Sequence, residues 1–219
     1  MTGTVGRIVF IPIFAFFMLL YRDRAKQFIL LVTKKNEKLT EGLLEQISKV
    51  TIKYMTGVLT VCAILAVTHS IALSIIGVKY AVFLGILAAS ISIIPYFGTL
   101  ASTVIPLSFS LILNKNPYEP LWIIGYFLFI NSVENNILTP TITGGNVNLN
   151  PFITILGLVL GATIWGIPGM IIVIPTLGII KIICDNVSGL EPYGYILGIE
   201  SKPKKVFKFM KRINKKEEE

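Results

Sequence analysis

Apolar residues occur in long runs along the chain, and polar segments separate these runs. Three runs are uninterrupted and cover about residues 5–21, 54–77 and 120–138. A helix needs about 20 apolar residues to cross roughly 30 Å of hydrocarbon. We therefore predict that each of these three runs spans a membrane as a single helix.

Two further runs, 80–113 and 151–184, are equally apolar, but each is interrupted near its middle. The residues at the interruptions are helix breakers: Pro95 and Gly98 in the first run, and Gly166, Pro168 and Gly169 in the second. Proline removes an amide donor and clashes with the preceding helical turn. Each limb then has about 15 residues, or roughly 22 Å of helix, which is short for a crossing. We predict two broken-helix hairpins that resemble re-entrant segments.

Residues 24–53 differ from these runs because apolar and charged positions alternate with a helical period. Apolar residues recur at spacings of three and four, at Leu39, Leu43, Leu44, Ile47 and Val50. This spacing predicts a cytoplasmic amphipathic helix that lies along the membrane surface or packs under the helix bundle. Residues 1–201 then form one transmembrane domain, and residues 202–219 form a basic cytoplasmic tail.

The composition supports a membrane protein. Hydrophobic residues make up 53% of the 219 residues and charged residues only 15%, whereas soluble domains have roughly 25% charged residues. The net charge of +8 arises from Lys and Arg residues that border the apolar runs, as in cytoplasmic loops of membrane proteins. We therefore expect contact with anionic lipid rather than with nucleic acid.

Catalytic motifs are absent from the sequence. His69 is the single histidine, and neither Cys62 nor Cys184 stands at metal-ligand spacing. We predict no enzyme activity, no cofactor and no metal site. His69 is expected to pack in the core with a hydrogen bond, in preference to relaying protons.

The polar cluster near the end of the run 120–138 is the strongest candidate for a binding site. It contains Asn131, Glu134, Asn135 and Asn136. A carboxylate near the membrane interior costs at least about 2.5 kcal/mol, so it usually faces a cavity or a partner. Glu134 is our first candidate for binding a cation or a proton. The alternative is that Glu134 reaches water at the membrane surface and bonds to the loop 141–150.

The two breaks are the second group of candidates, since a broken helix leaves amides and carbonyls that protein, water or a ligand must satisfy. These candidates are Pro95, Tyr96, Gly98, Gly166, Pro168 and Gly169. If both basic segments are cytoplasmic, the two hairpins open toward opposite sides of the membrane. Transporters often bind substrate where such discontinuous helices meet. The alternative is that the tips only pack against neighbouring helices.

Three strings in the chain resemble the C-terminal signature of the autoinducer-2 exporter (AI-2E) family, also called the PerM family of predicted permeases. These strings are SIIPYFGTLAS, VENNILTPTITGGNVNLNPF and GATIWGIPGMIIVIPTLGIIKII. The positions that match family motifs are Pro95, Tyr96, Gly98, Glu134, Asn135, Asn136, Pro140, Pro151, Gly161, Gly166, Gly169 and Pro175. Family members usually carry further N-terminal spans. We therefore expect a short relative or an incomplete reading frame.

The resemblance implies a multi-pass protein of the cell membrane that exports a small polar solute similar to autoinducer-2. We expect coupling to a proton or a sodium ion, with alternating access at the hairpin tips. Sodium/proton antiport is the alternative within transport, and a structural role in a membrane complex is the alternative outside it. A homo-oligomer is expected, because short broken helices would leave backbone groups near lipid unless neighbours cover them.

Overall fold

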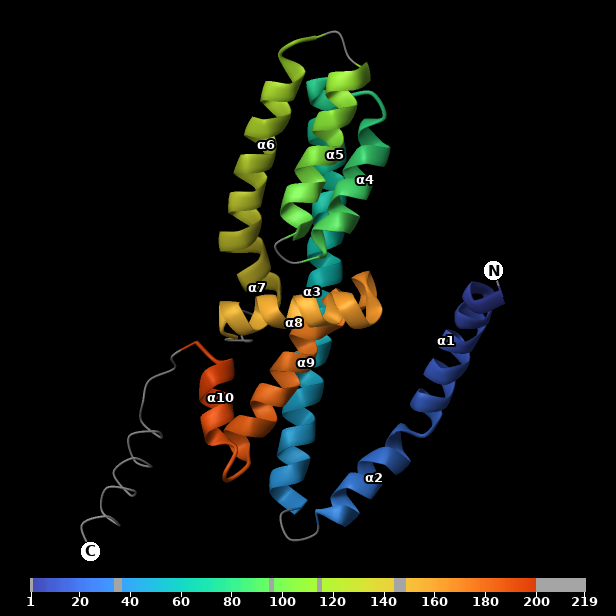
Figure 1. Ribbon diagram of the computed structural model, residues 1–219, viewed down its shortest axis with the longest axis vertical. Helices are drawn as coiled ribbons and strands as arrows, with labels where there is room; N and C mark the ends of the chain where they lie inside the picture. The colour runs from blue at the N-terminus through green and yellow to red at the C-terminus, as the bar shows by residue number, and fades with distance from the viewer. Residues whose placement is uncertain (1, 34–36, 95–96, 114–115, 144–148, 200–219) are drawn as a thin grey trace, which may run out of the picture. The chain divides into compact units, whose positions relative to one another are not determined.

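A computed structural model of the chain describes residues 2–33, 37–94, 97–113, 116–143 and 149–199 (Figure 1). These residues form helices joined by short turns, with one isolated β-bridge between Leu149 and Gly198. The predicted all-α fold is confirmed for the described part of the chain. Contacts divide the chain into two compact units, Met1–Gln46 and Ile47–Glu219.

The first unit contains α1 (Thr2–Leu20), α2 (Arg22–Val32) and the first turns of α3 (Glu37–Ile76). Lys26 of α2 forms an ion pair with Glu41 of α3 at 3.4 Å. The structure differs here from the sequence-based prediction, because α3 continues without a break past the boundary expected near Lys53. No proline interrupts α3, so its backbone hydrogen bonds run from the polar segment into the apolar one.

Helices long and apolar enough to cross a bilayer are present in the described part of the chain. By length and composition there are three: Glu37–Ile76, Glu119–Thr143 and Ile167–Asn186. The third is the second limb of the predicted hairpin 151–184, and with 20 residues it is longer than expected from the sequence. The predicted span 5–21 is not among the three, since its described apolar part is the shorter segment Phe10–Leu20. The outward side chains of the three helices include exposed large apolar residues such as Ile75, Leu121 and Ile172. Lipid is the solvent in which such a surface is stable, since water would have to cover it at a large free-energy cost. The chain is a membrane protein.

The core of the second unit lies among α3, α4 (Ala81–Ser92), α5 (Phe97–Leu113) and α6 (Glu119–Val133). In Figure 1, α4 and α5 run antiparallel to one another beside α3 and α6. The buried side chains at the centre are Leu65, Leu73, Leu84, Ile123 and Phe127. His69 is 1% exposed, and its Nδ1 lies 2.8 Å from the hydroxyl of Tyr126. This hydrogen bond confirms the packing role predicted for His69.

The helix that begins at Glu119 continues past residue 138, where the predicted span 120–138 ends, and past Pro140. After α6 the chain forms a π-helical turn, Glu134–Leu138, and then α7 (Thr139–Thr143). The amide of Thr139 donates to the carbonyl of Glu134, five residues earlier. This wider turn places Pro140 in the first turn of α7, where a proline needs no amide donor. The proline therefore shifts the helix instead of ending it.

The second hairpin consists of α8 (Pro151–Trp165) and α9 (Ile167–Asn186). Asn150 caps α8, because its Oδ1 accepts a hydrogen bond from the amide of Phe152 at 3.0 Å. Gly166 joins the two helices with φ 66° and ψ −140°, a backbone conformation that is essentially restricted to glycine. The sharp turn between the limbs thus depends on the glycine at this position.

A short helix, α10 (Glu191–Leu197), packs against α9 beyond the second hairpin. The two helices come close together at Gly194, where a Cβ atom would collide with Asp185 of α9. Asp185 also forms an ion pair with Lys181 one helical turn earlier. At the end of α10, the carbonyl of Leu197 accepts a hydrogen bond from the amide of Asn150 at 2.8 Å. Helix α10 therefore fixes the segment that leads into α8.

Candidate functional site

Glu134 occupies the first position of the π-helical turn that follows α6. The residue is 8% exposed, and its Oε2 is buried with no hydrogen-bond partner among the described residues. A buried carboxylate oxygen without a partner is costly, because it loses its hydration and gains nothing in return. π-helical turns inside α-helices also occur frequently at functional sites. Both observations select Glu134 as the centre of a candidate site.

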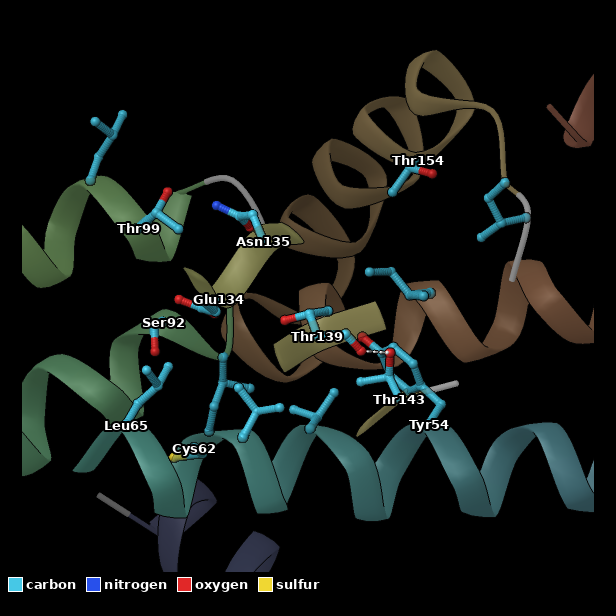
Figure 2. Close-up of a pocket in the computed structure, with 16 residues that line it drawn as sticks. Tyr54, Cys62, Leu65, Ser92, Thr99, Glu134, Asn135, Thr139, Thr143 and Thr154 are labelled. Carbon is cyan, nitrogen blue, oxygen red and sulfur yellow. Dashed lines mark hydrogen bonds between the residues drawn. The ribbon is translucent and has the colours of Figure 1, made fainter. Parts of the chain in front are cut away.

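A cavity of about 690 Å³ lies beside Glu134 within the second unit (Figure 2). Its walls come from α3, from the two sides of the break between α4 and α5, from the π-helical turn with α7, and from α8 and α9. The lining residues are Tyr54, Val58, Val61, Cys62, Leu65, Ser92, Ile93, Thr99, Leu100, Glu134, Asn135, Thr139, Thr143, Leu149, Thr154 and Ile174. Figure 2 shows the Glu134 carboxylate turned toward the side where Ser92 and Thr99 lie. Pockets of roughly 300–1,000 Å³ are typical of small-molecule sites.

The lining combines an apolar surface with hydroxyl groups and one carboxylate. Ser92, Thr143 and Thr154 each donate a hydrogen bond to a carbonyl of their own segment: to Ala89 at 2.8 Å, to Thr139 at 2.5 Å and to Asn150 at 3.0 Å. Their oxygen lone pairs remain as acceptors. No lysine, arginine or histidine is among the described lining residues. The cavity therefore has a largely apolar wall that carries one carboxylate and several hydroxyl groups.

The walls approach one another closely where small residues meet. A Cβ atom on Gly57 of α3 would lie 2.8 Å from Cα of Thr143 in α7, closer than real Cβ atoms come. A Cβ atom on Gly98 would lie 2.7 Å from Cα of Ser92. Glycine at these two positions thus lets α7 rest on α3 and lets α5 turn back tightly beside α4.

The structure brings only part of the predicted site together. Asn135 lines the cavity with Glu134, but Asn136 is exposed and donates to the carbonyl of Ser132 at 2.8 Å. Asn131 is half-buried and does not line the cavity. Pro95 and Tyr96 lie outside the described residues. Gly98, Gly166, Pro168 and Gly169 are outside the lining, although residues that flank the first break are part of it.

Several lining residues were missed by the sequence analysis, notably Tyr54, Thr143 and Thr154. Tyr54 is 9% exposed and lies on α3, about 80 residues before the polar cluster. Thr154 is 7% exposed on the first turn of α8. No spacing in the sequence links these positions, because helix packing alone brings them together. The one feature of the sequence that could have identified them is a hydroxyl side chain on an otherwise apolar helix.

Residues 1–189 match the sequence profile of a family described as AI-2E family transporter. The chain is 28% identical over 173 residues to "Putative transport protein YrrI" of Bacillus subtilis, which covers 78% of the chain and 48% of that protein. It is 30% identical over 125 residues to "AI-2 transport protein TqsA" of Escherichia coli, which covers 57% of the chain and 36% of that protein.

The matched region contains every helix that borders the cavity. It also contains α1, α2 and the break at Gly166. The chain spans about half the length of the curated relatives it matches: the alignment covers 48% of YrrI and 48% of a second Bacillus subtilis protein, "Putative transport protein YueF". Since the profile match covers most of the chain, the similarity extends well beyond one motif. The chain belongs to the AI-2E family of transporters.

Proposed function

We propose that this chain exports a small polar solute across the cell membrane and couples that movement to a proton or a sodium ion. The observation that supports the proposal is the buried, unpartnered Oε2 of Glu134, a residue that lines the cavity. A charge in such a place needs a counter-charge, which a mobile cation can supply. Membership in a transporter family supports the same conclusion.

The mechanism we propose is alternating access around the cavity. Glu134 takes up a cation when the cavity is open to one side and releases it when the cavity is open to the other. The break between α4 and α5 places Ser92, Ile93, Thr99 and Leu100 in the cavity wall. A small movement of this tip would change access to Glu134 without unfolding a long helix.

The proposed membrane arrangement has both hairpins entering the bilayer and returning to the side from which they came. The basic segment 202–219, outside the described residues, is then cytoplasmic. Exposed apolar side chains cover the transmembrane helices. Copies of the chain can cover part of this surface, so we propose a homo-oligomer.

Autoinducer-2 is the first solute to test, because the name of the relative TqsA assigns AI-2 transport to that protein. Sodium/proton antiport is a second candidate function, and the unpartnered carboxylate oxygen of Glu134 supports it. Flux of labelled sodium driven by a pH gradient separates the two functions.

Replacing Glu134 by glutamine tests the proposal. The purified chain is reconstituted in liposomes, and efflux of autoinducer-2 and of sodium is measured with and without an opposing ion gradient. We expect gradient-driven flux to fall at least about tenfold in Glu134→Gln, since the amide keeps the shape of the side chain but cannot carry the counter-charge.

Asn136→Ala serves as the matched control, because Asn136 lies two residues away but is exposed and bonds to its own helix. This variant should keep most of the flux. Undiminished flux in Glu134→Gln would remove the carboxylate from the mechanism. Absence of flux for every solute, together with stable co-purification of other proteins, would favour a structural role.

A further inference from the structure

The charge balance of the cavity restricts what it can bind. Glu134 supplies one negative charge when it is ionised, and none of the described lining residues supplies a positive one. A buried ion without a counter-ion is strongly unfavourable, and an anionic ligand would add a second negative charge beside the first. A ligand that carries its own positive charge removes this imbalance.

The hydroxyl groups add a second, independent restriction. The hydroxyl hydrogens of Ser92, Thr143 and Thr154 are used in bonds to helix carbonyls. Toward the cavity these three groups therefore offer oxygen lone pairs and no free donor. These three oxygens and the Glu134 carboxylate favour a ligand that donates several hydrogen bonds, as an ammonium group does with its three N–H bonds. The Asn135 amide and the hydroxyls of Tyr54 and Thr139 can also donate to a polar atom of the same ligand.

The size of the cavity favours a molecule over a bare ion. About 690 Å³ lies in the range of small-molecule pockets, roughly 300–1,000 Å³. The apolar residues Val58, Val61 and Leu65 form part of the α3 wall, which suits a ligand with a carbon skeleton. A sodium ion or a proton would occupy only the immediate surroundings of Glu134.

We propose that the cavity binds small solutes with a primary ammonium group, which pairs with the Glu134 carboxylate, and that hydroxyl oxygens of the wall accept hydrogen bonds from the same solute. This inference rests on the proposed function, because it names a class of solute for the same cavity. One carboxylate accommodates one positive charge at a time. The ammonium solute and the coupling cation therefore compete for Glu134, and this competition produces one-for-one exchange.

The test uses three probes of nearly equal size and different charge: ethanolamine, ethylene glycol and glycolate. Each is added at matched ionic strength to the purified full chain in lipid nanodiscs, and the midpoint of thermal unfolding is measured. We expect ethanolamine to raise the midpoint in a saturable manner and the other two probes to leave it unchanged. Tetramethylammonium, which has the charge but no N–H donor, should have little effect.

Two variants and one control locate the binding. Glu134→Gln should weaken the apparent affinity for ethanolamine at least about tenfold, as expected for a lost hydrogen bond to a charged group. Thr154→Val, which removes one acceptor, should weaken it less. Gly125→Ala is the control, because nothing lies within 4 Å of the added Cβ. Added sodium should weaken ethanolamine binding in the wild-type protein.

Two results would overturn the inference. One is an equal response to ethanolamine, tetramethylammonium and glycolate, which would indicate an effect of salt. The other is unchanged ethanolamine affinity in both Glu134→Gln and Thr154→Val. If Glu134→Gln does not fold, the ethanolamine affinity of Thr154→Val and the effect of added sodium on the wild-type protein test the inference instead. The binding is measured without a gradient, so its failure leaves Glu134-dependent flux intact, and a failure of flux leaves the binding result intact.

Discussion

Replacing Gly161 by leucine is expected to force α8 and α9 apart. A Cβ atom at Gly161 would lie 2.8 Å from the carbonyl oxygen of Gly169 and 2.6 Å from Cγ2 of Val173. The first neighbour is backbone, so α9 itself must move. Overpacking costs about 1–3 kcal/mol and more where the backbone cannot yield. We expect the midpoint of thermal unfolding in nanodiscs to fall by about 5 °C or more.

Gly125→Leu is the matched control for this substitution. Gly125 also lies inside an apolar helix, α6, but nothing is within 4 Å of a Cβ atom placed there. The leucine at this position should leave the midpoint nearly unchanged. If both variants lost the same stability, the effect would come from glycine replacement in general, and close packing of the second hairpin would not explain it.

Much of the helix content was predictable, because apolar runs and helix breakers act locally. The glycine at position 166 has φ 66° and separates α8 from α9, as a local rule of backbone conformation predicts. The continuity of α3 past Lys53 was not predicted. A change from amphipathic to uniformly apolar sequence alters the surroundings of a helix, but it does not break the hydrogen bonds along it.

The candidate site was predictable at its centre and not at its walls. Glu134 was found because a carboxylate in an apolar helix is unusual. The π-helical turn that places it depends on a shift in backbone hydrogen bonding around Pro140, which composition does not reveal. Tyr54 and Thr154 join the cavity through helix packing between distant segments, so no local pattern could select them.

Cysteine labelling is expected to show that the hairpin tips lie within the membrane. Phe97, beside the first break, is 61% exposed, and Ile164, beside the second, is 77% exposed. Residues near the first break line the same cavity as Val58 and Cys62, which lie one to two helical turns inside the apolar part of α3. Lipid should surround side chains at this depth, and the proposed re-entrant arrangement puts the second break inside the bilayer as well. Cysteines at positions 97 and 164 should therefore resist a bulky impermeant maleimide added from either side.

The labelling requires a background in which Cys62 and Cys184 are replaced by alanine. Tyr118→Cys and Tyr193→Cys are the controls, since these residues are 67% and 62% exposed at turns or short helices outside the apolar spans. In the proposed arrangement, Tyr118→Cys reacts from outside in intact cells and Tyr193→Cys reacts only in inverted vesicles. If a cysteine at position 97 or 164 reacted as fast as either control, that hairpin would cross the bilayer completely or lie at its surface. Such a result would place the break beside water, and a re-entrant tip could not then control access to Glu134.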